Sequence, residues 1–139
     1  MAVYTESFEL RTKGEVQVID VSDRVGAAIA RCSMRAGIAC VSKPSSTAAI
    51  VANENEAGLL EDLRDLLTKV VPAGRDYAHH RAWGEKNGHS HLRAMLLRPS
   101  VVFPISGGKA ALGPWQQILF VELDTRPRDR TVRVDLVGE

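Results

Sequence analysis

Hydrophobic and polar positions alternate over much of the chain, in a pattern that predicts strands. A period of two places every second side chain on one face of a strand. Two such segments, Tyr4–Arg11 and Glu15–Asp20, flank Lys13-Gly14 and predict a hairpin. Trp115 stands directly before a later strand, and we expect it to pack in the core. The further strands are expected at Ile38–Ser42, Thr47–Ala52, Ser100–Ile105, Gln116–Asp124 and Thr131–Val137.

Apolar residues at three- and four-residue spacing predict helices between these strands. One helix is expected to follow Ser22 and to end at Gly37. The clearest helix spans Glu56–Val70, and a shorter one spans Gly88–Leu97. Together the elements predict an α+β fold with a mostly antiparallel sheet and helices packed on one face. The apolar stripe of the clearest helix consists of Leu59, Leu60, Leu63, Leu66, Leu67 and Val70.

Composition limits the class of protein. A length of 139 residues predicts one domain, 1–139, and 45% apolar residues suffice for a core. A net charge of +1 gives no overall attraction to nucleic acid or to an anionic membrane. Neither a signal peptide nor an apolar run of membrane-spanning length is present, so we expect a cytoplasmic protein. Cys32 and Cys40 are expected to be reduced and buried.

All four histidines fall between positions 79 and 91. If His79, His89 and His91 converged with a carboxylate, they would suit zinc or a similar divalent ion. Positions 89 and 91 of a helix point about 200° apart, so both could join only in an extended turn. The alternative is that some rings donate to backbone carbonyls and the others face water.

Acidic and hydroxyl side chains near the clearest helix are further candidates. Glu54 stands just before this helix and Asp62 on its polar side. Acids at a helix N-terminus are ordinary caps, but Glu54 could also supply a metal ligand or proton acceptor beside the histidines. Ser46 and Thr47 could contact a ligand through their hydroxyl groups.

Three arginines alternate near the C-terminus, at Arg126, Arg128 and Arg130. Guanidinium groups grip phosphate or carboxylate through two hydrogen bonds, so this segment could hold an anionic ligand. Asp124 and Asp129 lie in the same segment and could instead neutralise the cluster. No aromatic platform accompanies the arginines, which disfavours nucleic acid as a partner.

Several motifs in this order resemble the YjbQ-like family, a group of secondary thiamine-phosphate synthases. They are PSSTAAIVANEN, DYAHH, NGHSHLRAMLL, LGPWQQILFVELD and RPRDR, and the resemblance covers roughly residues 15–138. It implies a compact α+β fold, assembly as a homotrimer, and a polar pocket that contains histidines and acids.

The resemblance and the residue chemistry together give a candidate site. The residues expected to act in catalysis are Glu54, Asp62, His79 and His91. Those expected to contact the substrate are Ser46, Thr47, Asn53, Asn87, His89, Arg126, Arg128 and Arg130. His79, His89 and His91 are the expected ligands of a divalent metal, zinc or magnesium.

The resemblance implies an enzyme that joins a pyrimidine diphosphate to a thiazole phosphate and releases diphosphate. One departure weighs against this activity: Ser45 stands where the family usually has a histidine. Serine cannot take up a proton near neutral pH as imidazole does. The alternative is therefore a non-catalytic homotrimer that binds a metal or a small ligand.

Overall fold

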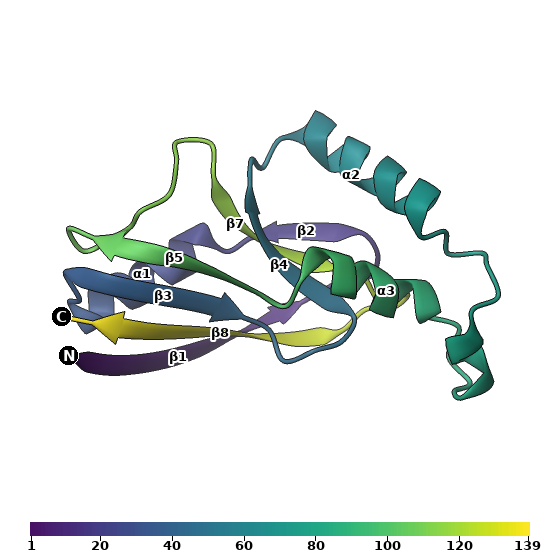
Figure 1. The fold of residues 1–139 in the computed structure, drawn as a ribbon, viewed down its shortest axis with the longest axis horizontal. Coiled ribbons are helices and arrows are strands. Elements are labelled where there is room, and N and C mark those ends of the chain that lie inside the picture. The colour runs from purple at the N-terminus through teal and green to yellow at the C-terminus, as the bar shows by residue number, and fades with distance from the viewer.

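Two antiparallel sheets form the framework of the computed structural model, which describes residues 1–139 (Figure 1). The five-stranded sheet has the order β1-β8-β3-β5-β6, and the three-stranded sheet has the order β2-β7-β4. The strands are β1 (Ala2–Arg11), β2 (Gln17–Asp20), β3 (Ala36–Ser42), β4 (Ala48–Asn53), β5 (Ser100–Ser106), β6 (Lys109–Ala110), β7 (Gln117–Glu122) and β8 (Asp129–Gly138). The helices are α1 (Ser22–Cys32), α2 (Ala57–Val70), the 3-10 helix η1 (Ala78–Arg81) and α3 (Gly88–Leu97). The α+β class is thus confirmed, with two sheets in place of one.

The prediction of a hairpin at the N-terminus is wrong. β1 pairs along its whole length with β8, from Ala2 opposite Gly138 to Arg11 opposite Asp129. β2 belongs to the other sheet, where it pairs with β7. Between the two strands Thr12 is buried, and its hydroxyl donates to Glu122 over 2.7 Å. The chain therefore crosses from one sheet to the other where its sequence is typical of a turn.

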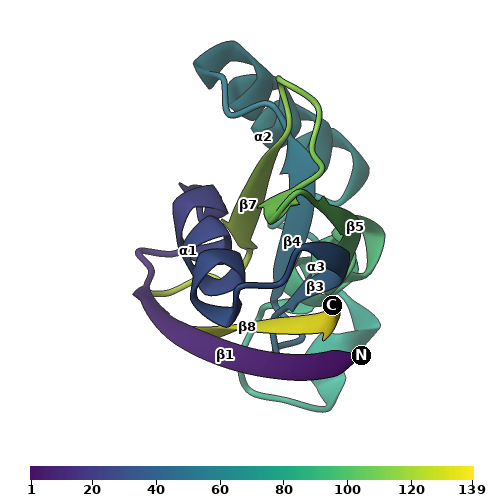
Figure 2. The same cartoon turned by 90° about the vertical axis from the view of Figure 1, so that its left-hand side faces the viewer.

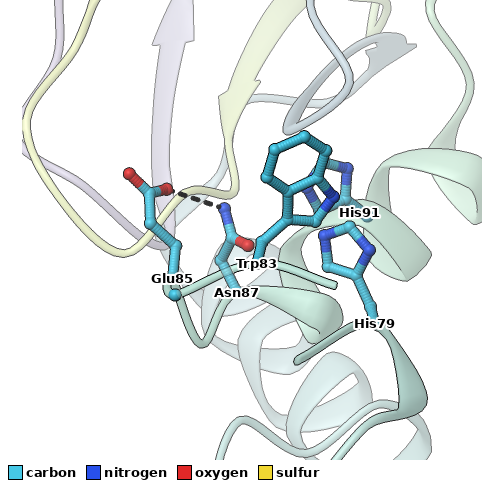
Figure 3. Close-up of a pocket in the computed structure, with 6 residues that line it drawn as sticks. His79, Trp83, Glu85, Asn87 and His91 are labelled. Atoms are coloured by element: carbon cyan, nitrogen blue, oxygen red, sulfur yellow. Dashed lines mark hydrogen bonds between the residues drawn. The ribbon is translucent and has the colours of Figure 1, made fainter. Parts of the chain in front are cut away.

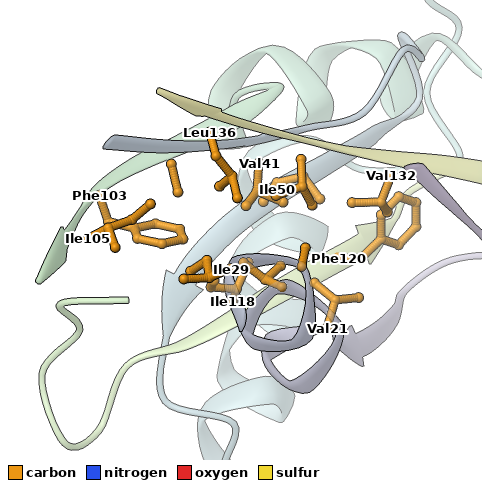
Figure 4. Close-up of a cluster of buried hydrophobic side chains, with 14 of the residues drawn as sticks. Val21, Ile29, Val41, Ile50, Phe103, Ile105, Ile118, Phe120, Val132 and Leu136 are labelled. Atoms are coloured by element: carbon orange, nitrogen blue, oxygen red, sulfur yellow. The ribbon is translucent and has the colours of Figure 1, made fainter. Parts of the chain in front are cut away.

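The main core lies between the two sheets, and one face of α1 packs into it through Val25, Ala28 and Ile29 (Figures 2 and 4). Ile50 of β4 and Phe120 of β7 point into it, whereas their neighbours Ala49 and Val121 point into a second cluster beneath α2 and α3. Both faces of the three-stranded sheet are therefore buried, which explains its continuous apolar runs. Helices cover both faces of this sheet, with α1 on one side and α3 on the other (Figure 2).

The apolar stripe of α2 is only partly covered. The helix begins at a cap, since the Glu56 carboxylate accepts from the backbone N–H groups of Gly58 and Leu59 at 2.7 and 2.8 Å. Leu67 is the one buried residue of the helix. Leu66 and Val70, by contrast, are 57% and 61% exposed.

Further expectations need correction. α1 ends at Cys32, because Ser33 adopts the left-handed conformation at φ 56°. Gly37 lies in β3 instead, where a Cβ would collide with the backbone of Val137. Trp115 is 71% exposed in the loop before β7, so its expected core position is wrong. The free cysteines are only half-buried. None of the helices has the length and apolar character needed to cross a membrane.

Candidate functional site

The loop after α2 folds back on the start of α3. The backbone N–H of Gly88 donates to Nε2 of His80 over 3.0 Å. A Cβ at Gly88 would stand 2.7 Å from Cβ of Tyr77, so the close approach requires glycine here. The Tyr77 and His80 rings pack in a T-shaped arrangement, with their centroids 5.7 Å apart. This local packing brings η1, and with it His79, against α3.

A cavity of about 500 Å³ opens at this junction (Figure 3). The imidazoles of His79 and His91, from η1 and α3, lie on its wall with their centroids 4.5 Å apart. Burial lowers the pKa of His91, and the neighbouring His79 lowers it further, against the attraction of Asp124 and Glu85. His91 is therefore a neutral imidazole at pH 7 and can donate or accept a hydrogen bond. The remaining lining residues are Trp83, Gly84, Glu85 and Asn87.

Carboxylates and guanidinium groups pair along the rim of the cavity. Glu85 accepts from Arg126 at 2.9 Å and from Arg128 at 3.4 Å. Arg128 Nε also donates to Asp124 at 2.8 Å. The Asn87 amide donates to both carboxylates, Glu85 and Asp124, at 3.4 Å each. Two positive and two negative side chains thus balance one another beside the histidines.

Asp124 stays ionised in spite of its burial. Burial alone would raise the pKa of this carboxyl group. Hydrogen bonds from the Thr125 backbone N–H, the Arg128 side chain and the Asn87 amide outweigh that effect and hold the pKa below its usual value. Asp124 is therefore a fixed negative charge that orients Asn87 and Arg128 at the cavity.

Arg130 does not face the cavity, which corrects its expected role in substrate contact. It is buried, and its guanidinium group donates to Glu122 at 2.7 and 2.5 Å. The same group donates to the Ser45 hydroxyl at 2.6 Å and to the Thr47 hydroxyl at 2.9 Å. Thr47 in turn donates to Asp124 at 3.2 Å. Thr47 therefore holds Asp124, and Arg130 in turn holds Thr47.

His89 also lies elsewhere than expected. It is 2% exposed, and its Nε2 stands 2.7 Å from the Glu15 carboxylate. Arg93 approaches the same carboxylate at 3.4 Å. Since residues 89 and 91 of a regular helix point in nearly opposite directions, His91 reaches the cavity and His89 does not. This placement corrects the expectation that His89 binds metal or substrate.

The other expected site residues lie apart from the histidines within one chain. Asn53 and Glu54 line a separate cavity of about 170 Å³ with a mostly apolar wall, beneath α2. Asp62 is exposed on α2, and Ser46 is exposed in the loop before β4. The expected convergence of Glu54 with His79 and His91 is therefore not found in the single chain.

The residues of one chain do not fit the expected metal. No group of three or more His, Cys, Asp or Glu side chains stands close enough to hold a metal ion. Zinc sites use three or four protein ligands, and His79 and His91 supply two. The nearby carboxylates of Glu85 and Asp124 are already paired with arginine.

Sequence reasoning missed three residues of the cavity, Trp83, Gly84 and Glu85, of which Trp83 and Glu85 contribute side chains with a chemical role. A signal for Glu85 did exist, because clustered arginines generally need nearby carboxylates. That signal could not choose Glu85 among the other acids of the chain. Nothing in the spacing around Trp83 distinguishes it from any aromatic residue in a loop.

Comparisons with known proteins extend over nearly the whole chain. A family model described as UPF0047 protein YjbQ-like matches residues 6–139. A UPF0047 protein of Methanothermobacter thermautotrophicus is 41% identical over 139 residues, which is 100% of this chain and 95% of the relative. One of Archaeoglobus fulgidus is 46% identical over 126 residues, 90% of this chain and 94% of the relative.

Solved structures also match the fold of this chain over nearly its whole length. The crystal structure of a hypothetical protein from Aeropyrum pernix K1 matches with a TM-score of 0.91 at 35% identity, over 98% of this chain and 99% of that one. A YbjQ-like protein of unknown function from Sulfolobus solfataricus P2 matches with a TM-score of 0.88 at 31% identity, over 99% and 100%. None of these names specifies an activity.

Proposed function

Because the chain belongs to the UPF0047 YjbQ-like family, we propose that its histidine cavity binds a small phosphorylated ligand and catalyses thiamine-phosphate synthesis as a secondary activity. In this reaction the thiazole nitrogen attacks the exocyclic methylene carbon of a pyrimidine diphosphate. A C–N bond forms, the C–O bond to diphosphate breaks, and diphosphate leaves with the electron pair. The observation that carries the proposal is the meeting of His79 and His91, 4.5 Å apart, on one cavity wall.

The chemistry requires stabilisation of the leaving diphosphate. Arg126 and Arg128 stand at the rim and supply two guanidinium groups once Glu85 moves aside. Glu85 and Arg126 are both about half exposed, so this exchange needs no repacking of the core. Neutral His91, together with His79, donates hydrogen bonds to phosphate oxygens.

A direct assay tests the proposal. Purified protein is given both phosphorylated substrates, with and without magnesium, and thiamine phosphate is measured. We expect His91→Ala to lower the rate at least tenfold, since removal of a transition-state hydrogen bond costs about 10²-fold in other enzymes. Arg11→Gln, at an exposed ion pair, is the control and should keep the wild-type rate. An unchanged rate in His91→Ala would refute this site.

One observation favours a second candidate, a non-catalytic homotrimer that binds a metal or small ligand. Ser45 replaces the histidine that the resemblance implies, and its hydroxyl is bound to Arg130 at 2.6 Å. No imidazole is therefore available at that position for proton transfer. Thermal unfolding with zinc, magnesium or thiamine phosphate separates the two candidates, because a ligand that prefers the folded state raises Tm. Stabilisation without turnover supports the binding protein.

A further inference from the structure

Trp83 is the only apolar residue that lines the histidine cavity. It lies between η1 and α3, belongs to neither hydrophobic cluster, and is 66% exposed. In Figure 3 its indole lies beside the imidazoles of His79 and His91, while the Glu85 carboxylate and the Asn87 amide lie on the other side. The cavity thus has an aromatic part and a charged part.

Packing within the chain does not explain this exposure. A tryptophan can bury between 150 and 250 Å², and its faces attract flat rings and cations. Gly84 follows immediately and adds no side chain to the cavity floor. Trp115 is similarly exposed but lies outside this cavity, so exposure alone does not mark a site. Trp83 differs from Trp115 because it lines a cavity together with histidine, glutamate and asparagine side chains.

We propose that Trp83 is the specificity-determining residue of the cavity, on which a flat heteroaromatic ring of the ligand stacks. The anionic group of the same ligand would then reach Arg126 and Arg128 at the rim. A positively charged ring gains additional attraction to the indole face. The inference rests on the proposed ligand site and deepens it, because it names the side chain that holds the ring of the ligand, apart from the arginines that hold its phosphate.

Single-tryptophan fluorescence tests this assignment. In Trp115→Phe protein, Trp83 is the only tryptophan that emits. Three probes are titrated: thiamine phosphate, which has rings and a phosphate; thiamine, which lacks the phosphate; and ethyl phosphate, which lacks the rings. We expect saturable quenching by thiamine phosphate, weaker quenching by thiamine, and none by ethyl phosphate.

Variants then measure the contribution of the indole by calorimetry. Trp83→Leu should weaken thiamine phosphate binding by about 5- to 150-fold, the range found for stacking of one base on an aromatic side chain. Trp83→Phe should restore most of the affinity, and Trp115→Leu, the matched control, should leave it unchanged. Circular dichroism melts of each variant verify folding.

The binding experiments on Trp83 and the turnover assay of the proposed function can fail independently of each other. If no turnover is found but thiamine phosphate binds and Trp83→Leu weakens it, the assignment holds and only the reaction is refuted. If turnover is found and Trp83→Leu keeps the wild-type KM and Kd, the assignment is overturned and the reaction stands. Equal binding of ethyl phosphate and thiamine phosphate, or no quenching by either ring-bearing probe at millimolar concentration, also overturns it.

Discussion

Glu85 acts as an internal anion for the arginines of the cavity rim. Its carboxylate accepts from Arg126 and Arg128 at 2.9 and 3.4 Å, in the place where a phosphate oxygen would bind. An anionic ligand must therefore compete with Glu85 before it gains the full attraction of both guanidinium groups. At the scale of single residues, we therefore expect Glu85 to limit how tightly the proposed site holds phosphate.

Glu85→Gln should consequently strengthen anion binding. The substitution keeps the shape of the side chain but removes the competing charge, so we expect inorganic diphosphate to bind about five- to tenfold more tightly at low salt. Isothermal titration calorimetry at two salt concentrations measures the change. Glu6→Gln, which removes a carboxylate paired with Arg31, serves as the control and should not alter diphosphate affinity. Unchanged affinity in Glu85→Gln would show that the rim does not bind the anion.

Lys43 gives a prediction on pH dependence. Burial, with a further contribution from the positive charge of Arg130, lowers the pKa of Lys43 to about 8, against the attraction of Glu122. The pKa of lysine in an unfolded chain is about 10.4, so between these values the unfolded state binds more protons and stability rises with pH. Below pH 8 Lys43 is charged in both the folded and the unfolded state. The folded state then carries the full free-energy cost of burying that charge.

Lys43→Met should therefore stabilise the protein at pH 7 by about 1 to 3 kcal/mol, although it leaves the Ser45 carbonyl without its donor. The advantage should shrink as pH rises above 8 and vanish near 10.4. Urea unfolding at several pH values measures it. The control, exposed Lys109→Met, should show no such trend. A stability difference independent of pH would exclude a charged buried lysine as its cause.

At the scale of elements, a largely buried cluster of polar side chains joins three segments that lie far apart in the chain. Glu15, in the connection between β1 and β2, holds His89 and Arg93 of α3 at 2.7 and 3.4 Å. Arg93 also donates to the carbonyl of Val71, at the end of α2, over 3.0 Å. The cluster thus fixes the helix that carries His91 relative to both neighbouring segments.

Removal of Glu15 should destabilise the fold markedly. Glu15→Ala leaves His89 and Arg93 buried without their carboxylate, at a cost of about 2 to 4 kcal/mol, below the upper range for fully buried pairs because Glu15 is partly exposed. The urea midpoint should fall accordingly. Asp129→Ala breaks an exposed ion pair of the same 2.7 Å length with Arg11 and should have little effect. Equal effects of the two substitutions would contradict a special role for the buried cluster.

Elements with a local signal could be predicted from the sequence, and those that depend on distant pairing could not. The Gly88–Leu97 helix has the predicted bounds because its ends are marked by Gly88 and Pro99. The prediction of an N-terminal hairpin was wrong because β1 pairs with β8, which lies more than a hundred residues away in the chain. The alternation of polar and apolar residues fixes which face of a strand is buried, but not which strand lies beside it.

The same distinction applies to the candidate site. The grouping of His79 with His91 follows from a short segment that folds back, so sequence position was informative. His89 was separable from His91 by helix geometry alone once the helix was predicted. The expected position of Glu54 beside the histidines could not be judged from the sequence, because it depends on how α2 and β4 are placed in three dimensions.

At the scale of the whole molecule, a single chain leaves large apolar side chains in water. Leu66 and Val70 stand exposed on α2, and Met95 and Leu96 on α3. Large exposed apolar patches commonly mark an interface, and Leu66 and Val70 lie one helical turn apart on the same face of α2. This exposure supports the homotrimer implied by the family resemblance, in which three copies would cover such surfaces in a closed ring.

Light scattering after gel filtration at micromolar concentration should therefore return three times the chain mass of 15.2 kDa. The double variant Leu66→Glu and Val70→Glu places two charges on the exposed apolar face of α2 and should shift the protein toward monomer, because burial of unpaired charge opposes association. Thr68→Glu adds a charge about 200° around the same helix from Leu66 and should leave the trimer intact. A wild-type monomer would remove the trimer altogether, whereas a double variant that stays trimeric would move the interface away from α2. Since α2 has Leu67 as its one buried residue, we also expect the double variant to keep its fold while losing its partners.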